Sequence, residues 1–239
     1  GYRAAATFDD KCVFLLGTTS SPHQLYFSNG TPEGTIKIDE MTSFDKYESF
    51  INNDPNYLYY VRNISGANDE LIQMDKKTAV IEKIYSGSSI KYLTYFNGKL
   101  IYANGSLYSF NLSNKTNSIL KSDLCYRPYW ITLANDRLFI LSQNWGEQNT
   151  LLTVSDGTPA GTITIKNLDI DKNSSPNFKG PWKVGNKIYF TFYGKSESTG
   201  QWSNNMWVSD GTESGTFVLK ELSSENNATY TAYGGGIDP

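Results

Sequence analysis

The sequence predicts an all-β protein, a β-propeller with five four-stranded antiparallel blades. Short apolar runs rich in Val, Ile, Tyr and Phe recur about every ten residues, and each ends at Asn, Asp or Gly, whereas apolar stripes with helical spacing are hard to find. One turn phrase also recurs, as YFSNGTPEGTIKI from Tyr26, TVSDGTPAGTITI from Thr153 and WVSDGTESGTFVL from Trp207. Strand-length runs around a repeated turn indicate a repeat protein.

The repeat unit has four strands, which are clearest in its last copy. There WKV and IYFTFYG are strands A and B around the turn GNK, and NMWVSDG and TFVLKEL are strands C and D around TESG. Two degenerate copies fill the long interval between the first and second phrases. The predicted units span residues 4–41, 46–85, 92–122, 128–168 and 180–222 of one domain, followed by an exit segment at 223–239.

Units of about 40 residues with four antiparallel strands are typical of propeller blades, which cannot bury both faces alone and stack around an axis. We expect the five units to close into a ring. The tail ATYTAYGGGIDP alternates like another strand A, and it is either a truncated sixth blade or an exit segment toward further chain. If the tail is a truncated blade, the protein has more than five blades, so a higher blade count stays an alternative.

The repeated phrase is predicted to form the hairpin between strands C and D. Its Ser and its Asp or Asn can accept hydrogen bonds from nearby backbone N–H groups, the first Gly supplies a positive φ, and the second Gly closes the loop. Turn chemistry explains every residue of the phrase, so we interpret it as structural and not as a ligand site.

Overall composition excludes some partners. A net charge of −3 and the absence of Lys and Arg clusters give no electrostatic basis for binding nucleic acid. No apolar run approaches the roughly 18 residues of a membrane-spanning helix. The first residues lack the apolar core of a signal peptide, as expected of a mature or excised piece of a protein.

At the repeated phrase the chain resembles the bacterial repeat family with the consensus E-L-W-x-x-D-G-T-x-x-G-T. NMWVSDGTESGT at 205–216 is the closest match, and the copies TLLTVSDGTPAGT and QLYFSNGTPEGT follow. The two middle units depart from the consensus, with QMDKKTAV and FNLSNKTNSI at the equivalent positions. The resemblance implies a secreted or surface-exposed bacterial protein without an assigned activity.

Candidate binding residues lie where the connections vary in length. In a propeller the B–C loops and D–A linkers share one face, and here they carry aromatic and amide side chains suited to stacking on a sugar and binding its hydroxyls. We predict a glycan site between the fourth and fifth units. Its predicted residues are Trp145, Trp202, Tyr126, Asn144, Gln148, Asp171 and Asn173.

Other aromatic residues near this face have alternative roles. Trp145 and Trp202 can equally pack within their loops, so both roles stay open for them. Trp130 and Trp182 alternate within strand A, which favours a position in the core between blades. Phe178 and Tyr129 belong to the same aromatic group.

Catalysis and metal binding find little support in the sequence. A propeller glycosidase needs two or three converging carboxylates, and the A strands supply only Glu48 unless Asp169 or Glu147 reaches inward. His23 is the single histidine, and its loop position predicts an ordinary surface residue. DIDKNSS at 169–175 begins like a calcium loop but lacks its Gly and its final acid, so a solvated linker is favoured. We expect no enzyme activity, cofactor or metal.

The two cysteines are predicted to be free thiols. Cys12 follows an A–B turn in the first unit, and Cys125 lies in a D–A linker before the fourth. These positions are on opposite faces of blades that are not neighbours, too far apart for the Cα separation of about 7 Å that a disulfide tolerates.

Three functions follow from the sequence. We favour a lectin-like recognition or adhesion module on the cell surface or outside the cell, which binds a glycan or other surface ligand. The first alternative is a structural or protein-binding propeller, the tip or spacer of a larger fibre, whose loops meet other subunits or further domains. The second alternative is a glycoside hydrolase.

Overall fold

The computed structural model describes most of the chain. The described residues are 2–17, 22–42, 50–64, 66, 68–122, 124, 127–144, 149–168, 178–195 and 202–222. No helix long and apolar enough to span a membrane occurs among them.

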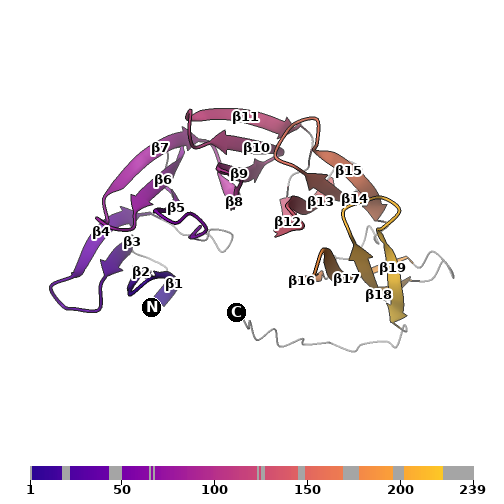
Figure 1. Cartoon of the computed structure of the whole chain (residues 1–239), viewed down its shortest axis with the longest axis horizontal. Coiled ribbons are helices and arrows are strands. Elements are labelled where there is room, and N and C mark those ends of the chain that lie inside the picture. Colours follow the sequence, from indigo (N-terminus) through magenta and orange to yellow (C-terminus); the bar gives the residue numbers. More distant parts are fainter. Residues whose placement is uncertain are drawn as a thin grey trace.

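Five antiparallel sheets follow one another along the chain (Figure 1). Blade 1 consists of β1 (Tyr2–Phe8), β2 (Lys11–Leu16), β3 (His23–Ser28) and β4 (Thr35–Met41). Blade 2 consists of β5 (Tyr57–Arg62), β6 (Asp69–Asp75) and β7 (Ile81–Gly87). Blade 3 consists of β8 (Lys91–Phe96), β9 (Lys99–Asn104), β10 (Ser106–Asn111) and β11 (Thr116–Lys121).

The last two blades are also four-stranded. Blade 4 consists of β12 (Arg127–Ala134), β13 (Arg137–Asn144), β14 (Asn149–Ser155) and β15 (Ile163–Leu168). Blade 5 consists of β16 (Lys179–Val184), β17 (Lys187–Lys195), β18 (Trp202–Ser209) and β19 (Phe217–Leu222). On the strand A side of blade 2, the described residues show a single bridge between Ile51 and Tyr59. The predicted five-bladed propeller is confirmed.

The prediction of a closed ring is wrong. Figure 1 shows the blades along an open arc, with blade 1 and blade 5 at its two ends and the first strand of each blade innermost. Contacts join β5 to β8, β8 to β12 and β12 to β16, which connects neighbouring blades near the axis. The tail at 223–239 lies outside the described residues.

The hydrophobic core lies between blades and not within them. One cluster joins Val13 and Leu15 of blade 1 to Ile72 of blade 2, and the other clusters join blades 2 and 3, 3 and 4, and 4 and 5. Each sheet therefore buries its side chains against a neighbour, as expected for stacked blades.

Burial patterns distinguish inner blades from end blades. In β9 the four residues from Leu100 to Ala103 are all buried, because both faces of blade 3 are covered. In β17, by contrast, Ile188, Phe190 and Phe192 are buried while the residues between them are partly exposed. This alternation marks a sheet packed on one face only.

The repeated phrase forms the same C–D turn in all three blades that carry it. In blade 4 the Ser155 and Thr162 hydroxyls lie 2.7 Å apart, Gly157 N–H donates to Ser155 Oγ, and Asp156 Oδ1 accepts from the hydroxyl and the N–H of Thr158. Hydrogen bonds from Thr158 lower the pKa of Asp156. The first glycine of the phrase has φ of 85°, 83° and 90° in blades 1, 4 and 5, which explains why Gly is used there.

The environments of three residues can be compared with their predicted environments. Trp130 packs against Phe190 with ring centroids 5.7 Å apart, in the core between blades 4 and 5 as predicted. Trp182 is 44% exposed, so the prediction that it lies in a core is wrong, because no blade among the described residues covers that face of blade 5. His23 is 7% exposed and begins β3, so it is not a surface loop residue as predicted.

Cys12 is a free thiol, as predicted. Cys125 lies outside the described residues.

Alanine at the first glycine of the phrase should cost more stability in blade 5 than in blade 1. Both backbones have positive φ, which costs an L residue about 1–2 kcal/mol. A Cβ on Gly211 would also lie 3.1 Å from the buried Phe139 ring, whereas one on Gly30 meets nothing within 4 Å. We expect Gly211→Ala to lower the unfolding free energy by about 1 kcal/mol more than Gly30→Ala in urea titrations. Equal losses of unfolding free energy in the two variants would show that the Phe139 ring moves away from the new Cβ at no cost.

Candidate binding face

Strand order assigns the connections to two opposite ends of the blades. The sheet orders make neighbouring strands antiparallel, so the A–B turns and the C–D turns lie at one end and the B–C loops and D–A linkers at the other. The second end, here called the variable face, includes the strand ends Asn144 and Asn149 of blade 4 and Lys195 and Trp202 of blade 5. The repeated turns lie at the opposite end.

Two of the predicted site residues are placed by the structure. Asn144 is the last residue of β13, and Trp202 is the first residue of β18 and not a loop residue as predicted. Both lie at the variable face of adjacent blades; their side chains are not described. The other predicted site residues, which are Trp145, Tyr126, Gln148, Asp171 and Asn173, lie outside the described residues.

The structure does not place the candidate catalytic acids or the segment that resembles a calcium loop. Glu48, Asp169, Glu147 and the segment 169–175 lie outside the described residues. Within the described ranges, no group of three or more His, Cys, Asp or Glu side chains could hold a metal ion.

An aromatic group lies between blades 4 and 5 near the variable face. The rings of Tyr129 and Phe178 have centroids 4.3 Å apart, and Phe178 is 5.4 Å from Phe192 in the core. The Tyr129 hydroxyl donates to Gln143 Oε1 at 2.6 Å. The structure thus brings Tyr129 and Phe178 together where the sequence predicted aromatic residues, and the partly buried pair is anchored on the core.

A hollow lies at the variable face of blade 1. It has a volume of about 350 Å³ and is lined by Leu16, Gly17, Pro22, Gln24 and Glu40. Glu40 forms an exposed ion pair with Lys37, which is typical of a solvated surface.

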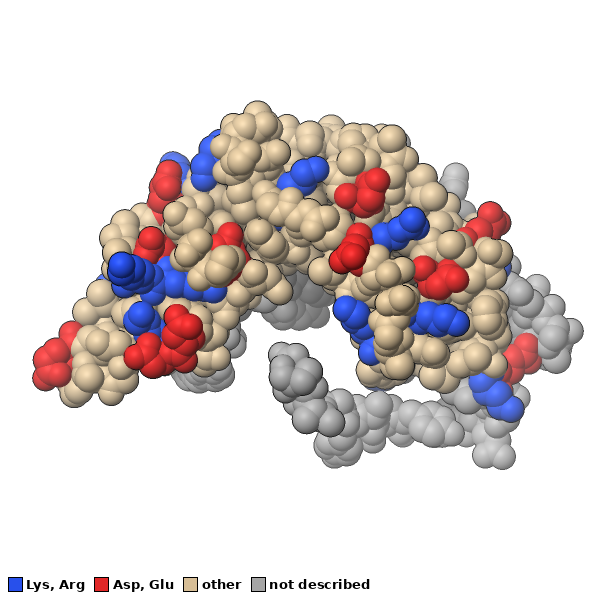
Figure 2. Space-filling view, in the orientation of Figure 1, with Lys and Arg blue, Asp and Glu red and all other residues tan. Residues whose placement is uncertain are grey.

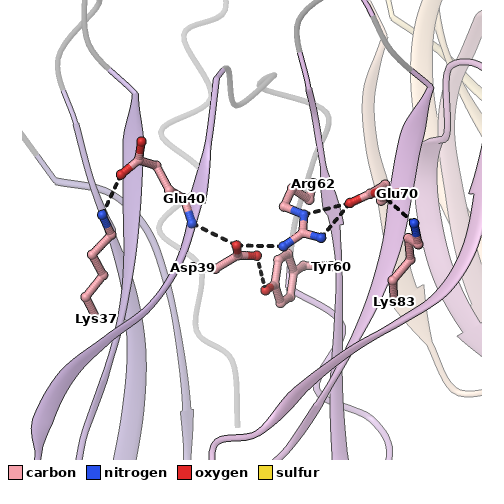
Figure 3. Close-up of polar contacts among 7 residues, drawn as sticks. All are labelled: Lys37, Asp39, Glu40, Tyr60, Arg62, Glu70 and Lys83. Carbon is pink, nitrogen blue, oxygen red and sulfur yellow. Dashed lines mark hydrogen bonds and ion pairs between the residues drawn. The ribbon is translucent and has the colours of Figure 1, made fainter.

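A charged network joins blade 1 to blade 2 (Figure 3). The Arg62 guanidinium donates to Asp39 at 2.8 Å and to Glu70 at 2.6 Å. The Tyr60 hydroxyl donates to the second oxygen of Asp39, and Lys83 pairs with Glu70 at 3.2 Å. Asp39 of blade 1 thus bonds Arg62 and Tyr60 of blade 2, which makes the network a structural link between the blades. Glu70 and Lys83 extend the network within blade 2.

The pKa shifts in this network follow from burial and from these bonds. Burial of the Tyr60 hydroxyl and the nearby Asp39 charge raise its pKa far above the ordinary value. Burial opposes ionisation of Glu70, but hydrogen bonds from Arg62 and Lys83 outweigh it and lower its pKa. Both groups keep the protonation states that hold the network together at neutral pH.

Sequence reasoning missed this network. Arg62 and Glu70 lie opposite each other on the neighbouring strands β5 and β6, but nothing in the chain indicates that Asp39 of blade 1 reaches Arg62. One signal in the sequence could have indicated a buried ion pair, because Arg62 ends the otherwise uncharged run YLYYVR.

Charges of both signs are interspersed on one side of the molecule. Figure 2 shows Lys and Arg beside Asp and Glu along the arc, without a patch of a single sign on the side in view. This distribution agrees with the net charge of −3.

Comparisons with known proteins identify the fold alone. No family model matches the chain, and no curated protein matches it. Among solved structures it resembles TolB from Acinetobacter baumannii, with 17% identity and a TM-score of 0.51 over 90% of this chain and 52% of TolB. A putative TolB from Agrobacterium tumefaciens has 11% identity and a TM-score of 0.53 over 88% of this chain and 77% of that protein.

Another similar fold occurs in an enzyme. One of two structurally analysed prolyl endopeptidases shares 9% identity with a TM-score of 0.58, over 91% of this chain and 34% of the peptidase. The chain therefore spans about half the length of the Acinetobacter TolB and a third of the peptidase. At these identities the likeness establishes a propeller architecture and no activity.

Removing the guanidinium of Arg62 should destabilise the protein in a pH-dependent way. Wild-type Glu70 has a lowered pKa, so its contribution is present above the unfolded pKa and is lost as pH falls through the folded one. Arg62→Met leaves two carboxylates beside a methionine, and we expect a loss of about 3 kcal/mol at neutral pH that shrinks below about pH 4.

Urea titrations at several pH values measure this effect. Lys83→Met is the control, because Lys83 is largely exposed and its loss should cost less than about 1 kcal/mol. A loss in Arg62→Met that does not change with pH would contradict the proposed role of the carboxylates.

Proposed function

We propose that the chain is a non-catalytic recognition module of a secreted or surface-exposed bacterial protein, which binds carbohydrate at its variable face. One observation carries this proposal. The topology gathers the long, dissimilar connections at one end of the blades, while the repeated turns occupy the other end. Variable loops on a rigid scaffold are where binding sites are typically found.

The chemistry of the face between blades 4 and 5 suits a sugar. Aromatic rings stack on the C–H faces of sugars, and amide and carboxylate groups bind the hydroxyls. Tyr129 and Phe178 provide anchored rings there, with the amide of Gln143 bonded to Tyr129. The remaining contacts of the proposed site come from Trp202, Asn144 and the neighbouring loop and linker residues Trp145, Gln148, Tyr126, Asp171 and Asn173.

The described carboxyl groups with shifted pKa values do not suit a glycosidase acid, and the candidate acids Glu48, Glu147 and Asp169 lie outside the described residues. Glycosidases need a general acid whose pKa is raised toward neutrality. Among the described carboxyl groups with a resolved shift, which are Glu70, Asp75, Asp156 and Asp210, the pKa is lowered in every case. These carboxylates are held ionised by hydrogen bonds and cannot supply a proton at neutral pH.

A second candidate is a protein-binding or spacer propeller in a larger fibre. The observation that favours it is the exposed apolar side of blade 5, where Trp182, Val184 and Phe217 are each more than 40% exposed. Exposed apolar groups of this kind are typical of protein interfaces. Here the partner would be another subunit or a further domain.

A glycan array with matched tryptophan variants tests the carbohydrate proposal. The double variant Trp145→Ala and Trp202→Ala should weaken glycan binding by more than about thirtyfold and leave the melting temperature nearly unchanged, because exposed aromatic hot spots contribute about 2 kcal/mol or more. Trp182→Ala is the control, because Trp182 is exposed on a different face, and it should bind glycans normally.

The outcomes separate the candidate functions. No binding by the wild-type chain on the array would remove the carbohydrate proposal and leave the protein-binding one. A fall in stability of several kcal/mol in the double variant would place both tryptophans in a core. Turnover of chromogenic glycosides would contradict a module without catalysis.

A further inference from the structure

A hydrogen bond from a basic side chain links each of blades 3 and 4 to the blade that follows. Lys99 is the first residue of β9, and its Nζ donates to the Gly157 carbonyl in blade 4 at 2.8 Å. Arg137 is the first residue of β13, and its Nη1 donates to the Gly211 carbonyl in blade 5 at 3.4 Å. In both cases the acceptor is the first glycine of the repeated turn.

An aromatic ring of the preceding blade packs on the same glycine. A Cβ on Gly157 would lie 3.2 Å from the Phe96 ring, and one on Gly211 would lie 3.1 Å from the Phe139 ring. The absence of a side chain at these two positions lets the ring approach the turn. A basic side chain and a ring on one blade thus fit a Ser-Asx-Gly turn on the next, and we call this pair of contacts the blade lock.

Blade 1 carries the acceptor half of a blade lock that is not filled. Its turn has the same internal hydrogen bonds as the others, with Ser28 Oγ 2.7 Å from Thr35 Oγ1 and accepting from Gly30 N–H. A Cβ on Gly30 would meet nothing within 4 Å. Among the described residues no side chain donates to the Gly30 carbonyl.

Blade 1 also exposes the ring pair that blade 5 buries. Phe14 pairs with Tyr26 in register, as Phe190 pairs with Trp207 in blade 5. The first pair stacks at 5.6 Å and the second at 6.3 Å. Phe190 and Trp207 are buried against blade 4, whereas Phe14 and Tyr26 are partly exposed.

Blade 5 carries the donor half of a blade lock. Lys187 is the first residue of β17 and precedes the partner of the turn serine, as Arg137 does in blade 4. Tyr189 follows at the position that Phe139 holds in blade 4, and it pairs with the exposed Trp182 on the uncovered face. Among the described residues Lys187 has no hydrogen bond or ion pair.

We propose that this chain associates head to tail, with blade 5 of one copy packed on blade 1 of a second copy. Lys187 then donates to the Gly30 carbonyl of the second copy, and Tyr189 packs on that glycine. The contact continues the packing that already joins blades 3, 4 and 5, and Figure 1 shows both surfaces at the ends of the arc. It does not depend on the ligand of the variable face.

Such a contact joins two different surfaces, so it is heterologous. Each bound copy still offers one unused end, and association continues into a ring or an open chain of copies. A concentration-dependent rise in mass beyond the dimer is therefore expected.

Sedimentation and light scattering of the intact chain test the proposal. The wild-type mass should rise from low micromolar to high micromolar concentration. Lys187→Met should weaken association about tenfold, the effect of losing one charged hydrogen bond. Gly30→Asn should abolish it, because Asn tolerates a positive φ while its side chain blocks the ring.

Two matched variants show that these effects are local. Gly105 also has a positive φ and nothing near its Cβ position, but it lies at the other end of the blades, so Gly105→Asn should associate normally. Lys99→Met removes the lock within the chain, so it should lower the unfolding free energy and leave association unchanged.

Mixing the two deficient variants gives the decisive result. Gly30→Asn retains an intact blade 5 and Lys187→Met retains an intact blade 1, so together they should form a one-to-one heterodimer with wild-type affinity, and growth beyond it should need about tenfold higher concentrations. A wild-type chain that stays monomeric at high micromolar concentration would overturn the proposal. Association of wild-type strength in both variants, or a mixture that forms no heterodimer, would overturn it too.

Discussion

Packing between blades is the constraint on which the rest of the structure depends. A four-stranded sheet has two faces and no interior, so its apolar side chains can leave water only against a neighbouring sheet. All four core clusters lie between blades. Polar contacts then fix how neighbours meet, through Arg62 between blades 1 and 2 and through Lys99 and Arg137 farther along.

The same constraint separates the two ends of the blades. Turns that also make contacts between blades must keep their shape, and the C–D turns of blades 4 and 5, which make such contacts, have matching hydrogen bonds. Connections at the variable face differ in length and composition, and fewer of their described residues join blades, as Thr42 does through the Asn63 carbonyl of blade 2. Recognition is proposed at the end of the molecule where sequence change disturbs packing least.

Much of this fold could be predicted from the chain, because its turns are encoded locally. The Ser, Gly and Thr residues of the repeated phrase identify the hairpins, and alternating apolar residues identify the strands around them. Arrangement over longer distances could not be predicted. Whether five blades close depends on the angle between neighbours, which no short pattern records, and the exposure of Trp182 follows from that angle. The prediction for His23 was wrong because the sequence pattern placed it in a loop, whereas it is the first residue of β3.

The candidate site was predicted only in part. Tyr129 and Phe178 meet as aromatic residues of one face, since strand order alone decides that they share it. The network of Arg62 was missed because its ion pair with Asp39 joins two blades, and the contact between blades is a tertiary property.

The hydrogen bonds of the repeated turn close within eight residues of chain, from Ser155 to Thr162 in blade 4. Its outward connection is a single carbonyl and the bare surface of one glycine. A blade built around such a turn can be duplicated or deleted as a genetic unit, because only the contacts at its two faces must be matched anew. The turn therefore allows the number of blades to change during evolution while the structure of each blade stays the same.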